Sequence, residues 1–194
     1  MAQRVFVDAN ILFSKTLMDW LFLLRNANEG MFQVHTTEDV IAEVISNFRK
    51  RTPRRQGCQT KRRSDLIRVS LDEIVPDFPD NLAFSGVDED DYHVHAAATQ
   101  CQADFLLTQN KPTDFTSSPH HEAYEIITAD DFFVLVVDSN PASLKYVTQA
   151  QLGYWAGSKK TLDQALVDAS CPHFSRRVEY EVGQLQRLPE IGRN

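Results

Sequence analysis

The apolar residues of this chain fall into short continuous runs that alternate with stretches of helical spacing. The first run ends at Val7 and leads directly into Asp8. This pattern predicts a buried strand whose carboxyl end delivers Asp8 into a crevice. The structural alternative is that Asp8 or Asn10 simply caps the next helix, because both residue types accept hydrogen bonds from free N–H groups there.

The same pattern predicts the remaining elements. Continuous apolar runs predict strands at residues 4–7, 32–35, 104–108 and 124–127. Apolar residues spaced three and four apart predict helices at about 11–26, 37–48, 66–74, 88–101 and 128–136, and helical spacing throughout from residue 140.

Strands that alternate with helices predict an α/β domain with a mainly parallel central sheet. We expect this domain to span residues 1–138 and to be followed by a helical C-terminal extension, residues 139–194. In such sheets the functional crevice lies outside the carboxyl ends of the strands. Asp8, Asn110 and Asp114 all follow predicted strands, so we expect them to reach the same crevice.

Composition and length are those of an ordinary globular protein. The 194 residues are 42% hydrophobic and 24% charged, which fits one compact domain with an extension. No apolar run approaches the roughly 20 residues of a membrane span, and the N-terminus lacks a signal-peptide pattern, so we expect a cytoplasmic protein with no membrane contact. Three widely spaced cysteines argue against a disulfide framework and a cysteine-rich zinc site.

The formal charge of −7 hides an uneven distribution. Residues 49–63 contain eight of the 20 basic residues and no acidic residue. We expect four arginines of this tract to position an RNA backbone: Arg54, Arg55, Arg62 and Arg63. A solvated loop and a docking surface for an acidic protein are the alternatives, because charge runs commonly serve as interaction tails.

Several carboxylates in one crevice repel each other unless protons or cations offset their charge. Mg²⁺ and Mn²⁺ prefer oxygen ligands, and a site of this kind can activate water and clamp a phosphodiester. Each acid also has a structural alternative. Glu43 can be a solvated flank of its helix, Asp90 and Asp91 can complement a helix dipole, and Asp114 with Asn110 can belong to an ordinary loop.

The joint order of these motifs resembles the PIN-domain nucleases, most closely the VapC-type toxin ribonucleases of bacterial toxin–antitoxin pairs. The matching segments cover roughly the first 138 residues: Val7-Asp8-Ala9-Asn10, Val40-Ile41-Ala42-Glu43-Val44, Asp90-Asp91-Tyr92-His93-Val94-His95-Ala96-Ala97-Ala98, and Ala103-Asp104-Phe105-Leu106-Leu107-Thr108-Gln109-Asn110 with Asp114-Phe115. The resemblance implies an α/β three-layer sandwich that binds Mg²⁺ or Mn²⁺, cleaves single-stranded RNA, often dimerises and is inhibited by a cognate antitoxin.

The resemblance also implies roles for single residues. Asp8, Glu43 and Asp91 take the three acidic roles, with Asp90 in reserve, and Asp8, Asp91 and Asp114 are the implied metal ligands. Asn10 and Thr108 accompany them in the motifs. Many members carry Thr-x-Asp where this chain has Thr108-x-Asn110, so Asp114 or a water must supply that charge. The helical tail is longer than the minimal domain and resembles that of a longer subfamily.

Two other functions fit parts of the pattern. A haloacid-dehalogenase-like phosphohydrolase also uses an aspartate after the first strand, but it normally has an aspartate where Asn10 stands. A catalytically silent fold that binds RNA or a protein is the other alternative. Metal titration followed by incubation with RNA and with a phosphomonoester separates the three.

Overall fold

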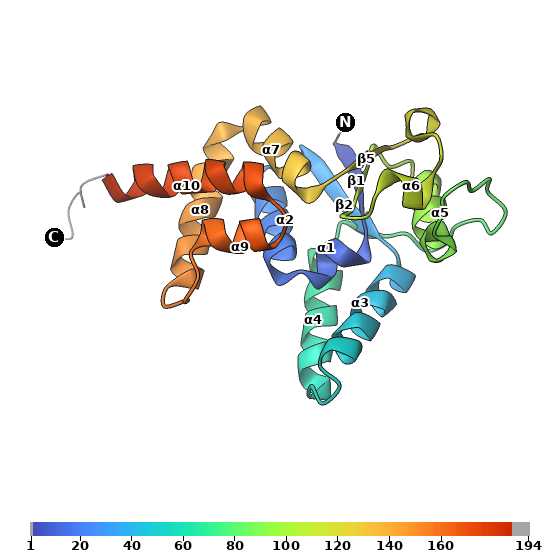
Figure 1. Cartoon of the computed structure of the whole chain (residues 1–194), viewed down its shortest axis with the longest axis horizontal. Coiled ribbons are helices and arrows are strands. Elements are labelled where there is room, and N and C mark those ends of the chain that lie inside the picture. The colour runs from blue at the N-terminus through green and yellow to red at the C-terminus, as the bar shows by residue number, and fades with distance from the viewer. Residues whose placement is uncertain (1, 188–194) are drawn as a thin grey trace.

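A single five-stranded parallel sheet forms the centre of the fold (Figure 1). The structure is a computed structural model that describes residues 2–187. The strand order is β3-β2-β1-β4-β5, and the strands are β1 (Gln3–Val7), β2 (Phe32–Thr36), β3 (Glu73–Ile74), β4 (Phe105–Leu107) and β5 (Glu125–Ile127). Every adjacent pair is parallel. The predicted α/β class with a parallel central sheet is therefore confirmed.

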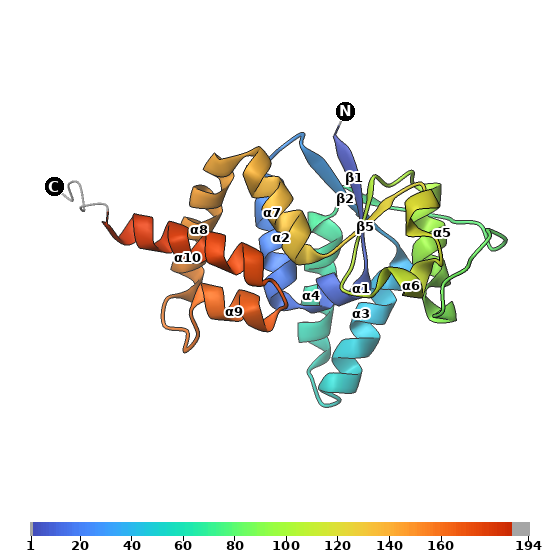
Figure 2. The same cartoon turned by 45° about the horizontal axis from the view of Figure 1, so that its top comes forward.

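Helices cover both faces of the sheet. In Figure 2 the strands lie between α2 and α7 on one side and α5 on the other. The helices are α1 (Ala9–Phe13), α2 (Lys15–Ala27), α3 (Glu38–Arg51), α4 (Gly57–Ser70), η1 (Glu89–Asp91), α5 (Tyr92–Gln100), α6 (Pro112–Phe115), η2 (Pro119–His121), α7 (Ala129–Ser139), α8 (Pro141–Trp155), α9 (Leu162–Asp168) and α10 (Pro172–Arg187). None of these helices, which lie within residues 2–187, is long and apolar enough to cross a membrane.

Central strands and helix caps follow local sequence signals. The last three residues of β1 and all of β4 are buried, as expected of parallel strands covered on both faces. Thr37 and Thr128 begin α3 and α7, because each side chain accepts a hydrogen bond from the backbone N–H three residues later.

The C-terminal helices share the core of the sheet domain. The Phe174 ring of α10 packs edge-on against Trp20 of α2 with a centroid distance of 5.0 Å, and it lies 5.2 Å from the Phe133 ring of α7. Side chains of α8, α9 and α10 belong to the same buried cluster as β1 and β4. Residues 188–194 of the predicted extension lie outside the described residues, and its boundary at residue 139 stays a prediction.

Two predicted helices are wrong in part. The helix expected over residues 11–26 is broken at Ser14, whose hydroxyl accepts a hydrogen bond from the Leu17 N–H and so starts a new helix, α2. The helix expected over residues 66–74 ends at Ser70, and Ile74 lies in β3, which pairs with the free edge of β2. A strand of two residues is too short to show its own period, and Ile74 happens to continue the helical spacing of the apolar residues before it.

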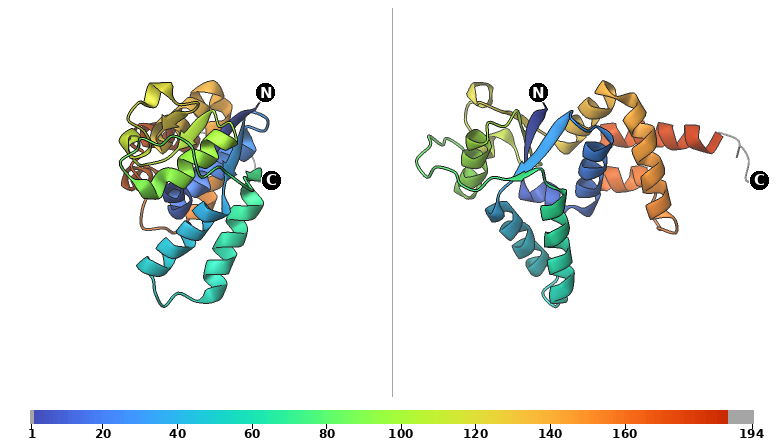
Figure 3. Two further views of the ribbon diagram at one scale, coloured as in Figure 1. Left: turned by 90° about the vertical axis from the view of Figure 1, so that its right-hand side faces the viewer. Right: turned by 180° about the vertical axis from the view of Figure 1, so that it is seen from behind.

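The basic tract is mostly helical. It comprises the end of α3, a short turn and the first half of α4, and these two helices form a hairpin that projects from the body (Figures 1 and 3). The alternative of an irregular solvated loop is therefore wrong for most of its length.

Candidate active site

Asp8 follows β1 and is almost fully buried, with 3% of its surface exposed. It is the N-cap of α1, because its Oδ1 accepts a hydrogen bond from the Ala9 backbone N–H. Its Oδ2 accepts hydrogen bonds from Thr108 Oγ1 at 2.6 Å and from Asn10 Nδ2 at 2.7 Å. The capping alternative therefore describes one oxygen of Asp8, while the other oxygen belongs to a polar cluster.

Thr108 reaches Asp8 because β1 and β4 are neighbours. Val7 pairs with Leu107, so the residues that follow the two strands meet at one edge of the sheet. The Thr108 hydroxyl also accepts hydrogen bonds from Asn10 Nδ2 at 3.0 Å and from the Asn110 N–H at 3.0 Å. One threonine thus joins the loops that follow two strands.

Asn110 links this cluster to Asp91. Asn110 Oδ1 accepts a hydrogen bond from Asn10 Nδ2 at 3.1 Å, and its Nδ2 donates to Asp91 Oδ2 at 3.0 Å. Asp91 stands at the start of α5 but makes no side-chain cap bond to that helix. A continuous chain of hydrogen bonds therefore connects Asp8 to Asp91 through Asn10, Thr108 and Asn110.

The two carboxyl groups of this chain are hard to ionise. Burial raises the pKa of Asp8 from its ordinary 3.8 to about 6; the hydrogen bonds from Thr108 and Ala9 oppose the rise, and the charge of Glu43 adds to it. Burial and then the charge of Asp8 raise the pKa of Asp91 to about 7. Ionising these two carboxyl groups costs free energy in this environment. A nearby cation would therefore favour their charged forms.

Glu43 and Asp114 lie at the edges of the cluster. Glu43 is exposed over 46% of its side chain, accepts a hydrogen bond from Asn47 and lies 3.9 Å from His93 Nε2. Its charge nevertheless raises the pKa of the Asp8 carboxyl, so it acts on Asp8 through space. Asp114 likewise raises the pKa of Asp91, although its own Oδ2 accepts the Lys111 N–H and caps α6.

Gly86 explains why the loop before α5 can lie against Asp114. A Cβ atom at Gly86 would fall on the Asp114 carbonyl oxygen, so only glycine permits this approach. The neighbouring backbone N–H of Val87 donates to Thr113 at 3.0 Å. The segment that carries Asp91 and the segment that carries Asp114 are thereby fastened together.

Asp90 differs from Asp91 in its surroundings. Asp90 is exposed, and its backbone N–H donates to the carboxylate of Asp88, which caps η1. Asp91 is half-buried and receives the Asn110 amide. One position along the 3₁₀ helix η1 turns the side chain by about 120°, which separates the two.

The donor set is suited to a hard cation, but it is not a closed metal cage. Among residues 2–187 no group of three or more His, Cys, Asp or Glu side chains is arranged to hold one metal ion. The oxygens near Asp8 and Asp91 are carboxylate, amide and hydroxyl oxygens, and Mg²⁺ takes only one or two carboxylates while it keeps several waters. The residues therefore fit a hydrated Mg²⁺ or Mn²⁺, and they do not fit a structural zinc site.

The four arginines predicted to bind RNA have different environments. Arg54 and Arg62 are exposed on the hairpin. Arg63 is half-buried; its Nη2 donates to the Leu12 carbonyl at 3.0 Å and its guanidinium lies over the Phe48 ring. Arg63 therefore holds α4 against α1, whereas Arg55 stays at the surface of a neighbouring cleft.

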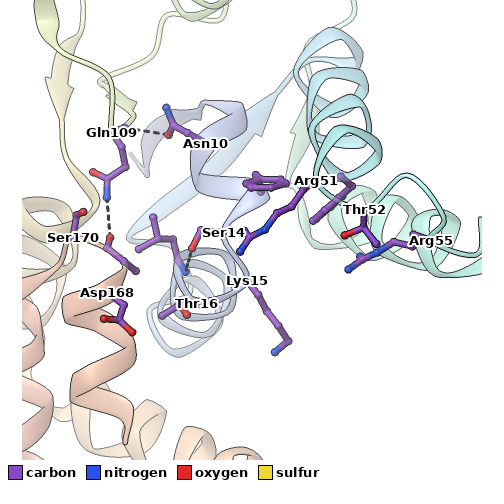
Figure 4. A pocket seen from close by; sticks show the side chains of 14 residues that line it. Asn10, Ser14, Lys15, Thr16, Arg51, Thr52, Arg55, Gln109, Asp168 and Ser170 are labelled. Carbon is purple, nitrogen blue, oxygen red and sulfur yellow. Dashed lines mark hydrogen bonds between the residues drawn. The ribbon is translucent and has the colours of Figure 1, made fainter. Parts of the chain in front are cut away.

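This cleft begins at Asn10 and was not anticipated from the sequence. Its volume is about 650 Å³, and it is bounded by the α1–α2 junction, the end of α3 and the turn between α9 and α10 (Figure 4). Gln109 lies where the cleft meets the polar cluster. Its backbone N–H donates to Asn10 Oδ1 and its side-chain Nε2 donates to the Ala169 carbonyl, both at 3.1 Å. The position of Gln109 inside the Thr-x-Asn motif is the only sequence signal of this contact.

Comparison with protein families supports the resemblance drawn from the motifs. A family model described as PIN domain matches residues 4–112, more than half of the chain. The matched range includes Asp8, Glu43, Asp91 and Asn110, and it ends two residues before Asp114. No curated protein and no solved structure matches the chain. The closer likeness to VapC-type toxins stays a prediction.

Proposed function

We propose that this chain, which belongs to the PIN-domain family, is a metal-dependent endoribonuclease that hydrolyses phosphodiester bonds in single-stranded RNA. PIN domains are generally nucleases. The RNA substrate and the metal requirement are part of the present proposal. The observation that carries them is the hydrogen-bonded chain from Asp8 to Asp91, in which two carboxyl groups with raised pKa values lie at the carboxyl edge of a parallel sheet.

In this proposal Asp8 and Asp91 hold a hydrated Mg²⁺ or Mn²⁺, with Asp114 at the edge of the site. A cation bound there would lower the pKa of a water and offset negative charge on the phosphodiester. Thr108 and Asn10 orient the Asp8 carboxylate by donating to Oδ2, and Asn110 orients Asp91. Glu43 presents a half-exposed carboxylate that can accept a proton at Oε2.

The test is cleavage of a labelled single-stranded RNA with Mg²⁺, with Mn²⁺ and with EDTA. We expect the wild type to cleave only with metal and Asp8→Asn to be inactive yet folded, because it lacks one anionic ligand. Asp80→Asn is the matched control, since Asp80 is an exposed aspartate in the loop before α5. Full activity of Asp8→Asn would rule out Asp8 as a ligand.

The same assay separates the alternative functions. Hydrolysis of p-nitrophenyl phosphate without RNA cleavage would favour a haloacid-dehalogenase-like phosphohydrolase. RNA binding without any hydrolysis would favour a catalytically silent fold.

Single alanine variants assign the third acidic position. Asp91→Ala should abolish cleavage, because Asp91 carries the carboxylate that receives the Asn110 amide, whereas Asp90→Ala should retain most of it. The reverse result would transfer the role to Asp90.

The finer proposal is that this ribonuclease is the toxin of a toxin–antitoxin pair, acts in the cytoplasm and forms a homodimer. The order of its acidic motifs supports this assignment. We expect induced expression in a bacterial host to arrest growth, with Asp8→Asn as the harmless control, and co-expression of a small adjacent reading frame to restore growth. Normal growth of a host that expresses the active enzyme would show that the protein is a ribonuclease but not a toxin.

A further inference from the structure

The cleft beside Asn10 has a cationic wall built by aromatic stacking. The Arg51 guanidinium lies 5.9 Å from the centroid of the Phe13 ring, and the Arg55 guanidinium lies 5.1 Å from that of Phe48. The two rings contact each other with centroids 4.9 Å apart. Arg51, Arg55 and the two phenylalanines thus form a cluster of cation–π and aromatic contacts that joins the end of α1 to the hairpin.

The two stacked arginines are available to a ligand. Within residues 2–187 neither Arg51 nor Arg55 has an acidic partner within ion-pair distance, and both line the cleft. Lys15 also lines it, but its ammonium is paired with Asp19 at 2.6 Å and lies over the Tyr154 ring. Contact with the rings restrains each guanidinium, and a guanidinium can make bidentate contacts with phosphate through its N–H groups.

The opposite wall comes from the C-terminal extension. Asp168, the last residue of α9, lines the cleft together with Ala169 and Ser170 of the turn that leads to α10. The hydrogen bond from Gln109 to Ala169 fastens this turn to the loop between Thr108 and Asn110. Asp168 also forms an ion pair with Lys160, so the wall carries one carboxylate. The extension therefore completes a groove that the sheet domain alone would leave open.

We propose that this cleft holds the single-stranded RNA that flanks the cleaved bond, with Arg51 and Arg55 on its phosphates and the C-terminal extension as the second wall. The proposal rests on the proposed function, and it adds a track for the substrate. Asn10 belongs both to the cleft and to the chain from Asp8 to Asp91, so a strand in the cleft leads to the carboxylates.

The contacts of the two phenylalanines indicate which part of an RNA the cleft binds. Phe13 already carries Arg51, and Phe48 already carries Arg55 and Arg63. Rings occupied in this way offer little surface for base stacking, so binding depends on phosphates, which carry no sequence information. Oligouridine and oligoadenosine of equal length should bind with similar affinity.

The first test measures binding apart from cleavage. Fluorescence anisotropy of a labelled oligouridine of about 12 nucleotides, within the usual single-strand site size, is followed in EDTA over a range of salt concentrations. Arg51→Gln/Arg55→Gln should weaken binding roughly tenfold and reduce the salt slope by about 1.4, because two phosphate contacts are lost. Arg176→Gln/Arg187→Gln is the control of equal charge, since both arginines are exposed on α10 and away from the cleft.

A second pair of variants separates the cleft from the whole basic tract. Arg54→Gln/Arg62→Gln removes two exposed charges of the hairpin that do not line the cleft. We expect Arg54→Gln/Arg62→Gln to lower the logarithm of the affinity for RNA by at most half as much as Arg51→Gln/Arg55→Gln does. An equal loss in the two pairs, or none in Arg51→Gln/Arg55→Gln, overturns the proposal, provided thermal unfolding shows that both variants are folded.

The wall that the C-terminal extension provides is tested with a substitution that should strengthen RNA binding. Asp168→Asn removes the carboxylate that would face the bound RNA and frees Lys160 from its ion pair. RNA should therefore bind about two- to threefold more tightly at low salt. Asp138→Asn is the matched control, because Asp138 is also ion-paired, with Arg177, but lies away from the cleft. An unchanged affinity of Asp168→Asn would overturn the role of this wall.

Failure of this proposal and failure of the proposed function give different results. If wild type cleaves RNA and the cleft variants bind as it does, the track is wrong and the nuclease stands. If the cleft variants lose binding in EDTA and wild type never cleaves, the track stands and the nuclease is wrong.

Discussion

Replacing Asp8 with asparagine should change how the stability of the metal-free protein depends on pH. The folded state raises the pKa of Asp8 from 3.8 to about 6, chiefly through burial. At about 1.36 kcal/mol per pKa unit, this corresponds to roughly 3 kcal/mol of differential stability.

The sign follows from proton binding. Between about pH 4 and pH 6 folded Asp8 retains a proton that the unfolded chain has already lost, so Asp8 makes the free energy of unfolding fall as pH rises through this range. The Asn variant has no such proton. It does lose a hydrogen bond, because one oxygen cannot serve Ala9, Asn10 and Thr108 together, and a lost cap costs about 1 kcal/mol.

We therefore expect the unfolding free energy of the variant, relative to wild type, to rise by roughly 2 to 3 kcal/mol from pH 4 to pH 7, with most of the rise below about pH 6. The variant should be the less stable protein at the acidic end and the more stable one at neutral pH. Asp91 should add to this change, because the charge of Asp8 is the second cause of its raised pKa.

Urea denaturation in EDTA at several pH values, followed by tryptophan fluorescence, to which the buried Trp20 contributes, measures the effect. Asp80→Asn, at an exposed position, should run parallel to wild type. At neutral pH, added Mg²⁺ should stabilise wild type and leave Asp8→Asn nearly unchanged, because a ligand stabilises only the state that binds it. Parallel curves for wild type and Asp8→Asn would refute the argument that burial makes this carboxylate costly.

Two further changes test other parts of the molecule. Phe174→Ala should lower the free energy of unfolding, measured by chemical denaturation, by about 3–5 kcal/mol, because the ring is fully buried against Trp20. A loss below about 1 kcal/mol would show that the extension packs loosely on α2. Asn110→Asp adds a third carboxylate to Asp8 and Asp91, at the position where an amide now donates to Asp91, so calorimetric titration should show Mn²⁺ binding on the order of tenfold more tightly and stability in EDTA should fall. Weaker Mn²⁺ binding would argue that Asn110 does not face the cation.

Much of the fold is encoded locally. The runs that form β1 and β4 are continuous and apolar because both faces of these strands are covered, and such runs are visible without any structure. Thr37 and Thr128 act as caps through their own hydroxyls, which a sequence also displays. Parallel topology then implies that Asp8 and Thr108 follow neighbouring strands, provided those strands pair.

Other elements depend on partners that are distant in the chain. The residues of β3 form a strand only because the edge of β2 is free to pair with them, and nothing in their own spacing shows it. Arg63 belongs to a basic tract by sequence, yet its contacts with Leu12 and Phe48 give it a packing role. Local periodicity indicates which face of an element is apolar, but it does not indicate which element covers that face.

The sequence by itself therefore determined the α/β class, the central strands and the order of the acidic motifs, since each follows from residues close together in the chain. Only the tertiary structure decided that Asn110 bridges to Asp91, that Arg51 and Arg55 stack on phenylalanines, and that residues 168–170 close the cleft. These are contacts between side chains separated by up to about 160 positions, such as Asn10 and Ser170, which line one cleft. Their geometry arises when the hairpin and the C-terminal helices pack on the sheet domain.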